Sequence, residues 1–301
     1  MPGALPFSHR ILLDGGIGTS LIAQGLDLSV EPPEMWNLTR PDAVIALHRR
    51  FFDAGADAIL TNSFGANRLR LAQIGCPVRP YELARTAARL ARESAPDGGL
   101  VFGSIGPTSQ LPPPDGNTDL IALEDAFAEQ AAALAEGGVD LLCVETMAHP
   151  KEARAALRGC RLGAAGLPVV LSMTVRRHGD HFQTTLGFAA ETMLSVATEE
   201  RAEGVGVNCG LVPGELCDLV ALLARSGLPV FAKPTIAPDG GPPLYPDELA
   251  RGFRALYNAG ACAVGGCCGT GPADIAAAKL ILEVDLTPPR PFSAAAAHPH
   301  L

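Results

Sequence analysis

Short apolar runs rich in Val, Ile and Leu recur along the chain, and longer stretches with a helical apolar period separate them. The runs are almost continuously apolar, a pattern typical of strands that are buried on both faces of a parallel sheet. They predict strands at residues 10–14, 57–62, 100–105, 139–145, 168–174, 204–208, 228–233 and 261–266. The stretches between them predict helices at residues 41–54, 81–95, 119–136, 150–164, 191–202, 213–225, 246–258 and 272–283.

Eight strands that alternate with eight helices in a chain of 301 residues predict a (β/α)8 (TIM) barrel of the α/β class. We expect the barrel to be a single domain over residues 1–285, followed by a loose, Pro- and Ala-rich tail at 286–301. The alternative fold is a doubly wound open sheet. It is disfavoured because the glycine-rich stretch 14–18 lacks the third glycine of the dinucleotide-binding fingerprint.

Composition and charge limit the cellular locations and the kinds of partner that we expect for this protein. The net charge of −9 argues against a basic surface for nucleic acid. No apolar run in the sequence approaches the roughly 20 residues of a membrane-spanning helix, and the first ten residues lack the apolar core of a signal peptide. We therefore expect a cytoplasmic protein whose eight cysteines are thiols or metal ligands rather than disulfides.

Three cysteines stand where predicted strands end, which is where barrel enzymes carry their working residues. Cys209 follows the sixth strand, and the adjacent Cys267 and Cys268 follow the eighth. Zinc prefers thiolate ligands in tetrahedral geometry, and three protein ligands leave a fourth position open, as in catalytic sites. The alternative, small buried apolar residues, is the better interpretation for the other cysteines: Cys76, Cys143, Cys160, Cys217 and Cys262.

A zinc ion with three thiolate ligands is a poor Lewis acid for water but binds a further soft ligand well, which predicts a thiol substrate. Asp14 and Glu145 end the first and fourth predicted strands, and we interpret them as anchors for a substrate ammonium group. For either residue alone, a helix cap or a structural hydrogen bond is an equally good interpretation. Further strand-end residues assigned to the substrate site are Thr61, Asn62, Ser104, Gly106 and Asn208.

The motifs at these strand ends resemble the homocysteine S-methyltransferase family. That family includes betaine–homocysteine methyltransferase and the homocysteine-binding module of cobalamin-dependent methionine synthase. The resemblance runs from about Ile11 to about Leu282, and its most specific parts are Val207-Asn208-Cys209 and Gly265-Gly266-Cys267-Cys268-Gly269. It implies a zinc-binding (β/α)8 barrel with Cys209, Cys267 and Cys268 as the ligands.

The same resemblance assigns roles to substrate-binding residues. It implies that Asp14 and Glu145 hold the homocysteine amino group and that backbone amides near Ser104 and Gly106 hold its carboxylate. The segment 33–37 resembles bacterial betaine-type members, and it contains Trp36, the one tryptophan of the chain.

An aromatic face binds a quaternary ammonium or sulfonium group through cation–π contact, so Trp36 and Phe64 are the predicted donor-binding residues. The alternative is that Trp36 packs a loop. Animal betaine enzymes carry a second aromatic at the strand-two loop, where this chain has Gly65 after Phe64, so the aromatic cage is incomplete.

These features support a zinc-dependent enzyme that transfers a methyl group from a betaine-like or sulfonium donor to homocysteine and forms methionine. The first alternative is a homocysteine-presenting subunit of a split cobalamin-dependent methionine synthase, with the cobalamin on a separate protein. The second is a structural zinc protein without a reaction. The expected partners are small-molecule substrates, with neither nucleic acid nor membrane, and a homo-oligomer is left open.

Overall fold

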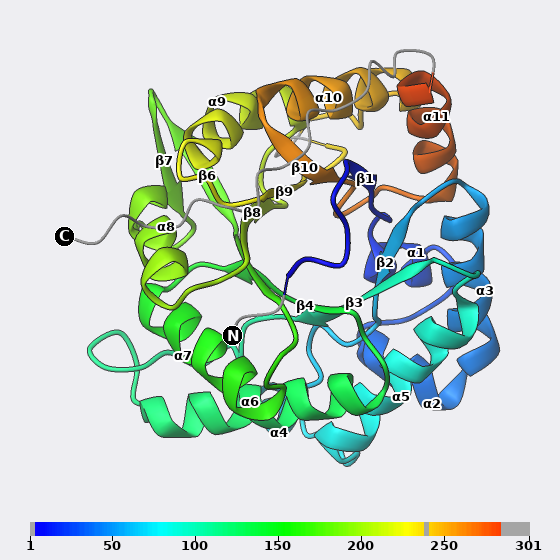
Figure 1. The fold of residues 1–301 in the computed structure, drawn as a ribbon. Helices are drawn as coiled ribbons and strands as arrows, with labels where there is room; N and C mark the ends of the chain where they lie inside the picture. The colour runs from blue at the N-terminus through cyan, green and yellow to red at the C-terminus, as the bar shows by residue number, and fades with distance from the viewer. Residues whose placement is uncertain (1–3, 238–240, 284–301) are drawn as a thin grey trace.

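The computed structural model describes residues 4–237 and 241–283. Within them, eight parallel strands form one sheet in the order β1-β10-β9-β8-β5-β4-β3-β2. The strands are β1 (Ile11–Leu12), β2 (Ala58–Leu60), β3 (Leu100–Ile105), β4 (Leu141–Met147), β5 (Val169–Met173), β8 (Gly204–Asn208), β9 (Val230–Lys233) and β10 (Ala261–Val264). A parallel bridge between Leu13 and Ala58 joins the first and last strands of that order and closes the ring (Figure 1). The predicted (β/α)8 barrel is confirmed.

Helices surround this ring on the outside (Figure 1). The main ones are α3 (Pro41–Asp53), α5 (Pro80–Ser94), α6 (Leu120–Glu136), α7 (Pro150–Gly163), α8 (Ala190–Glu199), α9 (Pro213–Ala224), α10 (Pro246–Ala259) and α11 (Pro272–Glu283). Proline begins most of them, at the position where its missing N–H costs no helical hydrogen bond. All eight predicted helices are present, and their described ends lie within a few residues of the expected ones. The predicted tail, 286–301, lies outside the described residues.

Some elements were not predicted, and all of them lie in connections that follow strands. The connections after β1 and β2 contain α1 (Ile17–Ile22), the 3₁₀ helix η1 (Pro33–Met35), α2 (Trp36–Thr39) and α4 (Arg68–Gln73). The connection after β5 contains an antiparallel hairpin of β6 (Val175–His178) and β7 (His181–Thr184). The pair Gly179-Asp180 at its turn, with Gly179 at φ 60°, is a recognisable hairpin signal.

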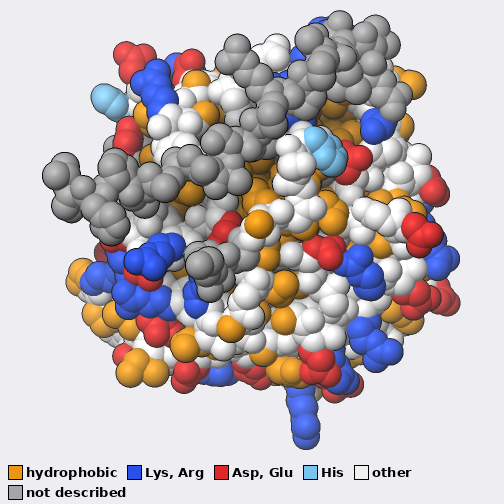
Figure 2. Space-filling model, viewed as in Figure 1, with side chains coloured by type: hydrophobic (Ala, Val, Ile, Leu, Met, Phe, Trp, Pro, Cys, Tyr) orange, Lys and Arg blue, Asp and Glu red, His pale blue; other side chains and the backbone are white. Residues whose placement is uncertain are grey.

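The N-terminal segment closes one end of the barrel. It crosses the middle of the ring in Figure 1. Phe7 packs against Phe102 and Phe231 of the barrel interior, with ring centroids 6.3 and 5.9 Å apart. Lys and Arg side chains intermix with Asp and Glu on the face shown in Figure 2. The functional end is therefore the opposite one, where the strands end.

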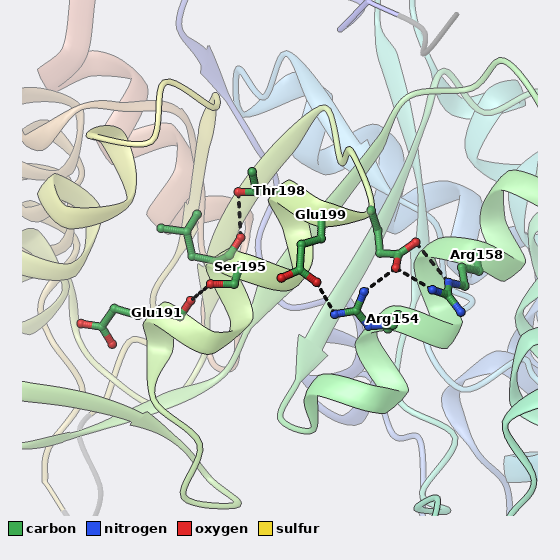
Figure 3. A network of polar contacts seen from close by, with 8 residues as sticks. Arg154, Arg158, Glu191, Ser195, Thr198 and Glu199 are labelled. Atoms are coloured by element: carbon green, nitrogen blue, oxygen red, sulfur yellow. Dashed lines mark hydrogen bonds and ion pairs between the residues drawn. The ribbon is translucent and has the colours of Figure 1, made fainter. Parts of the chain in front are cut away.

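Ion pairs tie neighbouring outer helices together, as between α7 and the end of α8 (Figure 3). Arg154 donates hydrogen bonds to Glu199 at 2.5 Å and to Glu200 at 2.6 Å, and Arg158 donates to Glu200 at 3.0 Å. Partly exposed pairs of this kind contribute up to about 1 kcal/mol each, so they adjust the packing of the helices rather than determine the fold. No helix in the described part of the chain combines the length and apolar character needed to cross a bilayer.

A buried histidine predicts how stability depends on pH. His48 of α3 is fully buried, and neither ring nitrogen has a hydrogen-bond partner among the described residues. Burial lowers the pKa of its imidazole from 6.5 to about 4. As the pH falls from 6.5 towards 4, the unfolded chain binds a proton at this histidine that the folded chain does not bind. The unfolding free energy therefore falls by about 3 kcal/mol over this range.

We expect the substitution His48→Leu to remove this pH-dependent loss of stability. The measurement is the unfolding free energy of both proteins from urea titrations at pH 7 and pH 4.5. The difference between wild type and variant should change by most of that 3 kcal/mol, with the wild type relatively weaker at pH 4.5. A difference that is the same at both pH values would contradict the argument.

Candidate metal centre and ligand cavity

The three predicted metal ligands come together at the open end of the barrel. Cys209 directly follows β8, and Cys267 and Cys268 follow β10. Their sulfur atoms all lie within 4.8 Å of one another, and the Sγ atoms of Cys209 and Cys268 are 3.6 Å apart. Among the described residues, these three cysteines are the one cluster of at least three His, Cys, Asp or Glu side chains close enough to share a metal ion. The sequence prediction of a convergent cysteine cluster agrees with this geometry.

Cys209 has a backbone conformation that residues other than glycine rarely adopt. Its φ is 59°, and Gly210 follows with φ 70°. Two hydrogen bonds hold the turn: the Cys209 amide donates to the Lys233 carbonyl at 2.9 Å, and the Leu211 amide donates to the Cys209 carbonyl at 2.7 Å. A non-glycine residue in such a conformation costs about 1–3 kcal/mol, and such residues cluster at functional sites. The strand end is thus bent so that the thiol faces the other two.

Cys267 and Cys268 are fixed by loops from two neighbouring strands. The Cys267 amide donates to the Pro234 carbonyl at 2.8 Å, and the Cys268 carbonyl accepts from the Ile236 amide at 3.2 Å. Gly266, just before the pair, donates its amide to the Asp14 carbonyl at 2.9 Å. These backbone contacts position adjacent cysteines so that both thiols point to one place.

The electrostatics of the cluster favour a cation. Hydrogen bonds from Cys267 and then Cys268 lower the pKa of the Cys209 thiol to about 3. The same contact with Cys209 raises the pKa of Cys267 well above its usual value of 9.0 and also raises the pKa of Cys268. A positive charge bound among the three sulfurs would favour loss of the remaining thiol protons.

The spacing of the sulfur atoms fits a soft divalent metal. Zinc–sulfur bonds of about 2.3 Å in a tetrahedral arrangement place sulfur ligands roughly 3.8 Å apart. The observed separation of 3.6 Å is close to that distance and much longer than a disulfide bond. A donor set of three sulfurs favours zinc over the hard cations magnesium and calcium. The residues present therefore fit a zinc ion with one open position.

The cluster opens on a cavity of about 570 Å³. Its walls come from the glycine loop 15–19, from segment 28–34, from segment 60–65 and from several strand ends. The strand-end residues that line it include Ser104, Glu145, Thr146 and Lys233. A cavity of this size accommodates a small amino acid together with a second small molecule.

Asp14 is not free to bind a substrate ammonium group. It is fully buried and is not among the residues that line the cavity, and each of its carboxylate oxygens already accepts a hydrogen bond. Oδ1 accepts from the Lys233 ammonium at 2.6 Å, and Oδ2 accepts from the Leu60 amide at 2.8 Å. Lys233 stands at the end of the seventh barrel strand, but sequence reasoning assigned it no role. The available signal was its position, since Lys233 ends a predicted apolar strand.

Glu145 does face the cavity. One of its oxygens accepts a short hydrogen bond from the Ser104 hydroxyl. Burial raises the pKa of Glu145, and the charge of Lys233 opposes that rise. Burial also raises the pKa of Asp14, again against the charge of Lys233. The two carboxyl groups thus depend on one internal cation.

The backbone amides predicted to bind a carboxylate already have partners. The Ser104 amide donates to the Thr61 hydroxyl at 2.9 Å, and the Gly106 amide donates to the Phe64 carbonyl at 2.8 Å. Gly106 is required for another reason, since a side chain there would overlap the Phe64 ring at 2.6 Å. Thr61 and Ser104 line the cavity, whereas Gly106 supports its wall from behind.

The two predicted asparagines hold loops in place. The Asn62 amide group donates to the Pro33 carbonyl at 2.7 Å and thereby fixes segment 28–34 over the cavity. The Asn208 side chain accepts from the Thr146 amide at 2.9 Å and donates to the Thr146 hydroxyl at 2.7 Å. Thr146 needs this support because its φ is 63°. Asn62 lines the cavity, and Asn208 acts through Thr146.

Of the two aromatic residues predicted to bind the donor, Phe64 lines the cavity and Trp36 does not. Trp36 is 1% exposed and is not among the residues that line the cavity. The Arg40 guanidinium covers its ring at 4.6 Å, and its indole N–H donates to Glu31 at 2.9 Å. Phe64 does line the cavity, but the Arg70 guanidinium lies 5.3 Å from its ring centroid. Trp36 thus packs a loop, whereas Phe64 is part of the cavity wall beside Arg70.

Fold and site together define a (β/α)8 barrel with three clustered thiols, which could hold a soft metal, at the mouth of a cavity for a small ligand. The chain belongs to the homocysteine S-methyltransferase family, whose sequence model matches residues 11–282.

Two curated relatives are methionine synthases. That of Mycobacterium tuberculosis is 34% identical over 296 residues, and that of Mycobacterium leprae is 33% identical over 293 residues. The matches cover 89% and 88% of this chain but 24% of each relative. The chain therefore spans about a quarter of the length of these proteins.

Solved structures with the same fold include the homocysteine methyltransferase MmuM of Escherichia coli. Its metallated form matches with a TM-score of 0.74 and 24% identity, covering 90% of this chain and 96% of that chain. Its oxidized form matches with a TM-score of 0.74 and 23% identity, covering 90% and 95%. At this level of identity the likeness concerns the fold.

Proposed function

We propose that the chain is a zinc-dependent S-methyltransferase that moves a methyl group from a betaine-like or sulfonium donor to homocysteine and forms methionine. The observation that carries the proposal is the convergence of three thiols within 4.8 Å at the mouth of the cavity. The family supports the acceptor, because the sequence model that matches is that of homocysteine S-methyltransferases.

The chemistry follows from the donor set. Zinc held by Cys209, Cys267 and Cys268 would bind the acceptor thiol as its fourth ligand and keep it as a thiolate at neutral pH. The acceptor sulfur attacks the methyl carbon in line, and the donor leaves as a neutral amine or sulfide. No base is needed in the transfer step itself, because the attacking sulfur would already be a thiolate.

The protein contributes position and desolvation. The cavity brings both reactants to one place, and well-oriented reactants gain several kcal/mol over free encounter. Apolar side chains such as Ile17, Ile22 and Leu60 line it and exclude water from the positively charged donor, which loses its charge in the reaction. A low-polarity wall favours that loss of charge.

The length of the methionine synthase relatives supports a second candidate function. The methionine synthase relatives are about four times as long as the aligned region, which covers 24% of each. The chain would then present homocysteine to a methylcobalamin carried by a separate protein. In that case small onium donors would give no methionine.

A donor screen tests the proposal. Zinc-loaded protein and homocysteine are incubated with glycine betaine, dimethylsulfonio-acids, S-methylmethionine or methylcobalamin, and methionine is measured by mass spectrometry. We expect methionine with at least one small onium donor, and no methionine with protein stripped of metal by a chelator. Methionine from methylcobalamin alone would favour the second candidate. No methionine from any donor would contradict both.

The cytoplasmic location remains a prediction, as does zinc as the metal.

A further inference from the structure

Lys233 places a positive charge at the base of the cavity. Its side chain is buried at the end of β9, and its Nζ atom lies 2.6 Å from Oδ1 of Asp14. The Asp14 carboxylate forms a buried ion pair with this amine. Lys233 therefore remains an ammonium group at neutral pH, and it lines the cavity beside the metal centre.

This ammonium fills the place that a ligand's ammonium would take. Two buried carboxylates beside a cavity need a cation, because an unpaired buried charge costs several kcal/mol. Here the chain supplies that cation itself. Asp14 is fully buried and is not among the residues that line the cavity, and its second oxygen accepts from the Leu60 amide at 2.8 Å. Glu145 has one oxygen bound to the Ser104 hydroxyl.

In place of the predicted Asp14 carboxylate, a ligand in the cavity therefore meets the Lys233 ammonium group. Lys233 carries three N–H donors, and the described residues account for one of them at Asp14. Its remaining donors suit an anionic oxygen. The backbone amides of Ser104 and Gly106, the other predicted carboxylate site, are occupied within the protein.

We propose that Lys233 determines acceptor selectivity: it takes the place of an acceptor ammonium group and binds the acceptor's carboxylate instead. The acceptors of this site are then thiol carboxylates, with or without an α-amino group. The inference rests on the proposed function, since it concerns the thiol that the metal centre receives.

Three probes separate the groups involved. Homocysteine carries the thiol, the carboxylate and the α-amino group. 4-Mercaptobutyrate has the same chain without the amino group, and 4-mercapto-1-butanol lacks the carboxylate as well. Binding of each to zinc-loaded protein is measured by isothermal titration calorimetry, which requires no methyl donor.

For the wild type we expect homocysteine and 4-mercaptobutyrate to bind with dissociation constants within roughly fivefold of each other, because the ammonium group has no free pair of carboxylates. The alcohol should bind more weakly by roughly tenfold or more, since it loses a charge-assisted hydrogen bond. A wild-type preference for homocysteine over 4-mercaptobutyrate of more than roughly tenfold would overturn the inference. This comparison needs no variant.

Lys233→Met then tests the residue. Removing the ammonium exposes Asp14, so the preference should move towards homocysteine by roughly tenfold or more. The double variant Asp14→Asn, Lys233→Met has the same cavity without either charge, and we expect it to show no such gain. A Lys233→Met protein whose preference equals that of the wild type would also overturn the inference. If none of the three thiols binds, the proposed function itself fails, whereas binding selective for homocysteine overturns the inference alone.

Discussion

Cys209→Ala is expected to reduce bound zinc from about one equivalent per chain to a small fraction and to abolish methyl transfer. Cys209 supplies one of three sulfur ligands, and its thiol is the most acidic of the cluster, with a pKa lowered to about 3 by hydrogen bonds from Cys267 and Cys268. Loss of an outer-shell partner alone lowers metal affinity by about 10–100-fold, so loss of a ligand should cost at least that much. Zinc content by mass spectrometry and methionine formation measure the two effects.

Cys217→Ala is the matched control. Cys217 lies on α9, half-buried, and its thiol contacts the Pro213 carbonyl at 3.5 Å within the same helix. It is not part of the cysteine cluster, so its variant should keep full zinc content. A Cys209→Ala protein that retains stoichiometric zinc would show that the metal centre is elsewhere or absent.

The barrel could be predicted because its strands are buried on both sides. Strand β3 at Leu100–Ile105 and strand β8 at Gly204–Asn208 have the bounds that their apolar runs indicate. Short elements carry too little periodicity to be predicted in this way. Helices α1 and α4 have six residues each, little more than one and a half turns. Helices of that length depend on tertiary packing.

The metal ligands could be predicted for a topological reason. The carboxyl ends of parallel strands meet at one end of a barrel, so residues from β8 and β10 converge whatever the details of packing. What the pattern does not give is which strand-end side chains pair with each other. Asp14 and Lys233 are 219 positions apart in the chain, and only the closed ring brings them to 2.6 Å.

Trp36 does not reach the cavity for a local reason. It begins the four-residue helix α2, and Arg40, directly after that helix, places its guanidinium over the indole ring. A helix this short carries too little periodicity to be predicted, so the sequence did not show that Arg40 is the partner of the ring. The Arg70 contact with Phe64 was not predictable either, because Arg70 lies on α4, another short helix that depends on tertiary packing.

Gly15→Ala is expected to disturb the metal centre without touching a ligand. A methyl group at Gly15 would lie 2.2 Å from the Thr270 carbonyl oxygen and 2.9 Å from its carbon. That carbonyl accepts from the Gly16 amide at 3.0 Å, and the Thr270 amide donates to the Cys267 carbonyl at 3.2 Å. The methyl group would therefore push the loop that carries Cys267 and Cys268 away from Cys209.

We expect Gly15→Ala to lose about 3 kcal/mol of unfolding free energy, because the clash is with backbone that a rotamer change cannot relieve. Zinc affinity should fall with it, as measured by competition with a chelating dye. Gly18→Ala is the control three residues along the same loop. A methyl group there would meet only the Pro33 side chain at 3.8 Å, and alanine favours the helix α1 in which Gly18 lies. Equal stability and zinc affinity in the two variants would refute the idea that close packing of the glycine loop against the Cys267 loop positions the metal ligands.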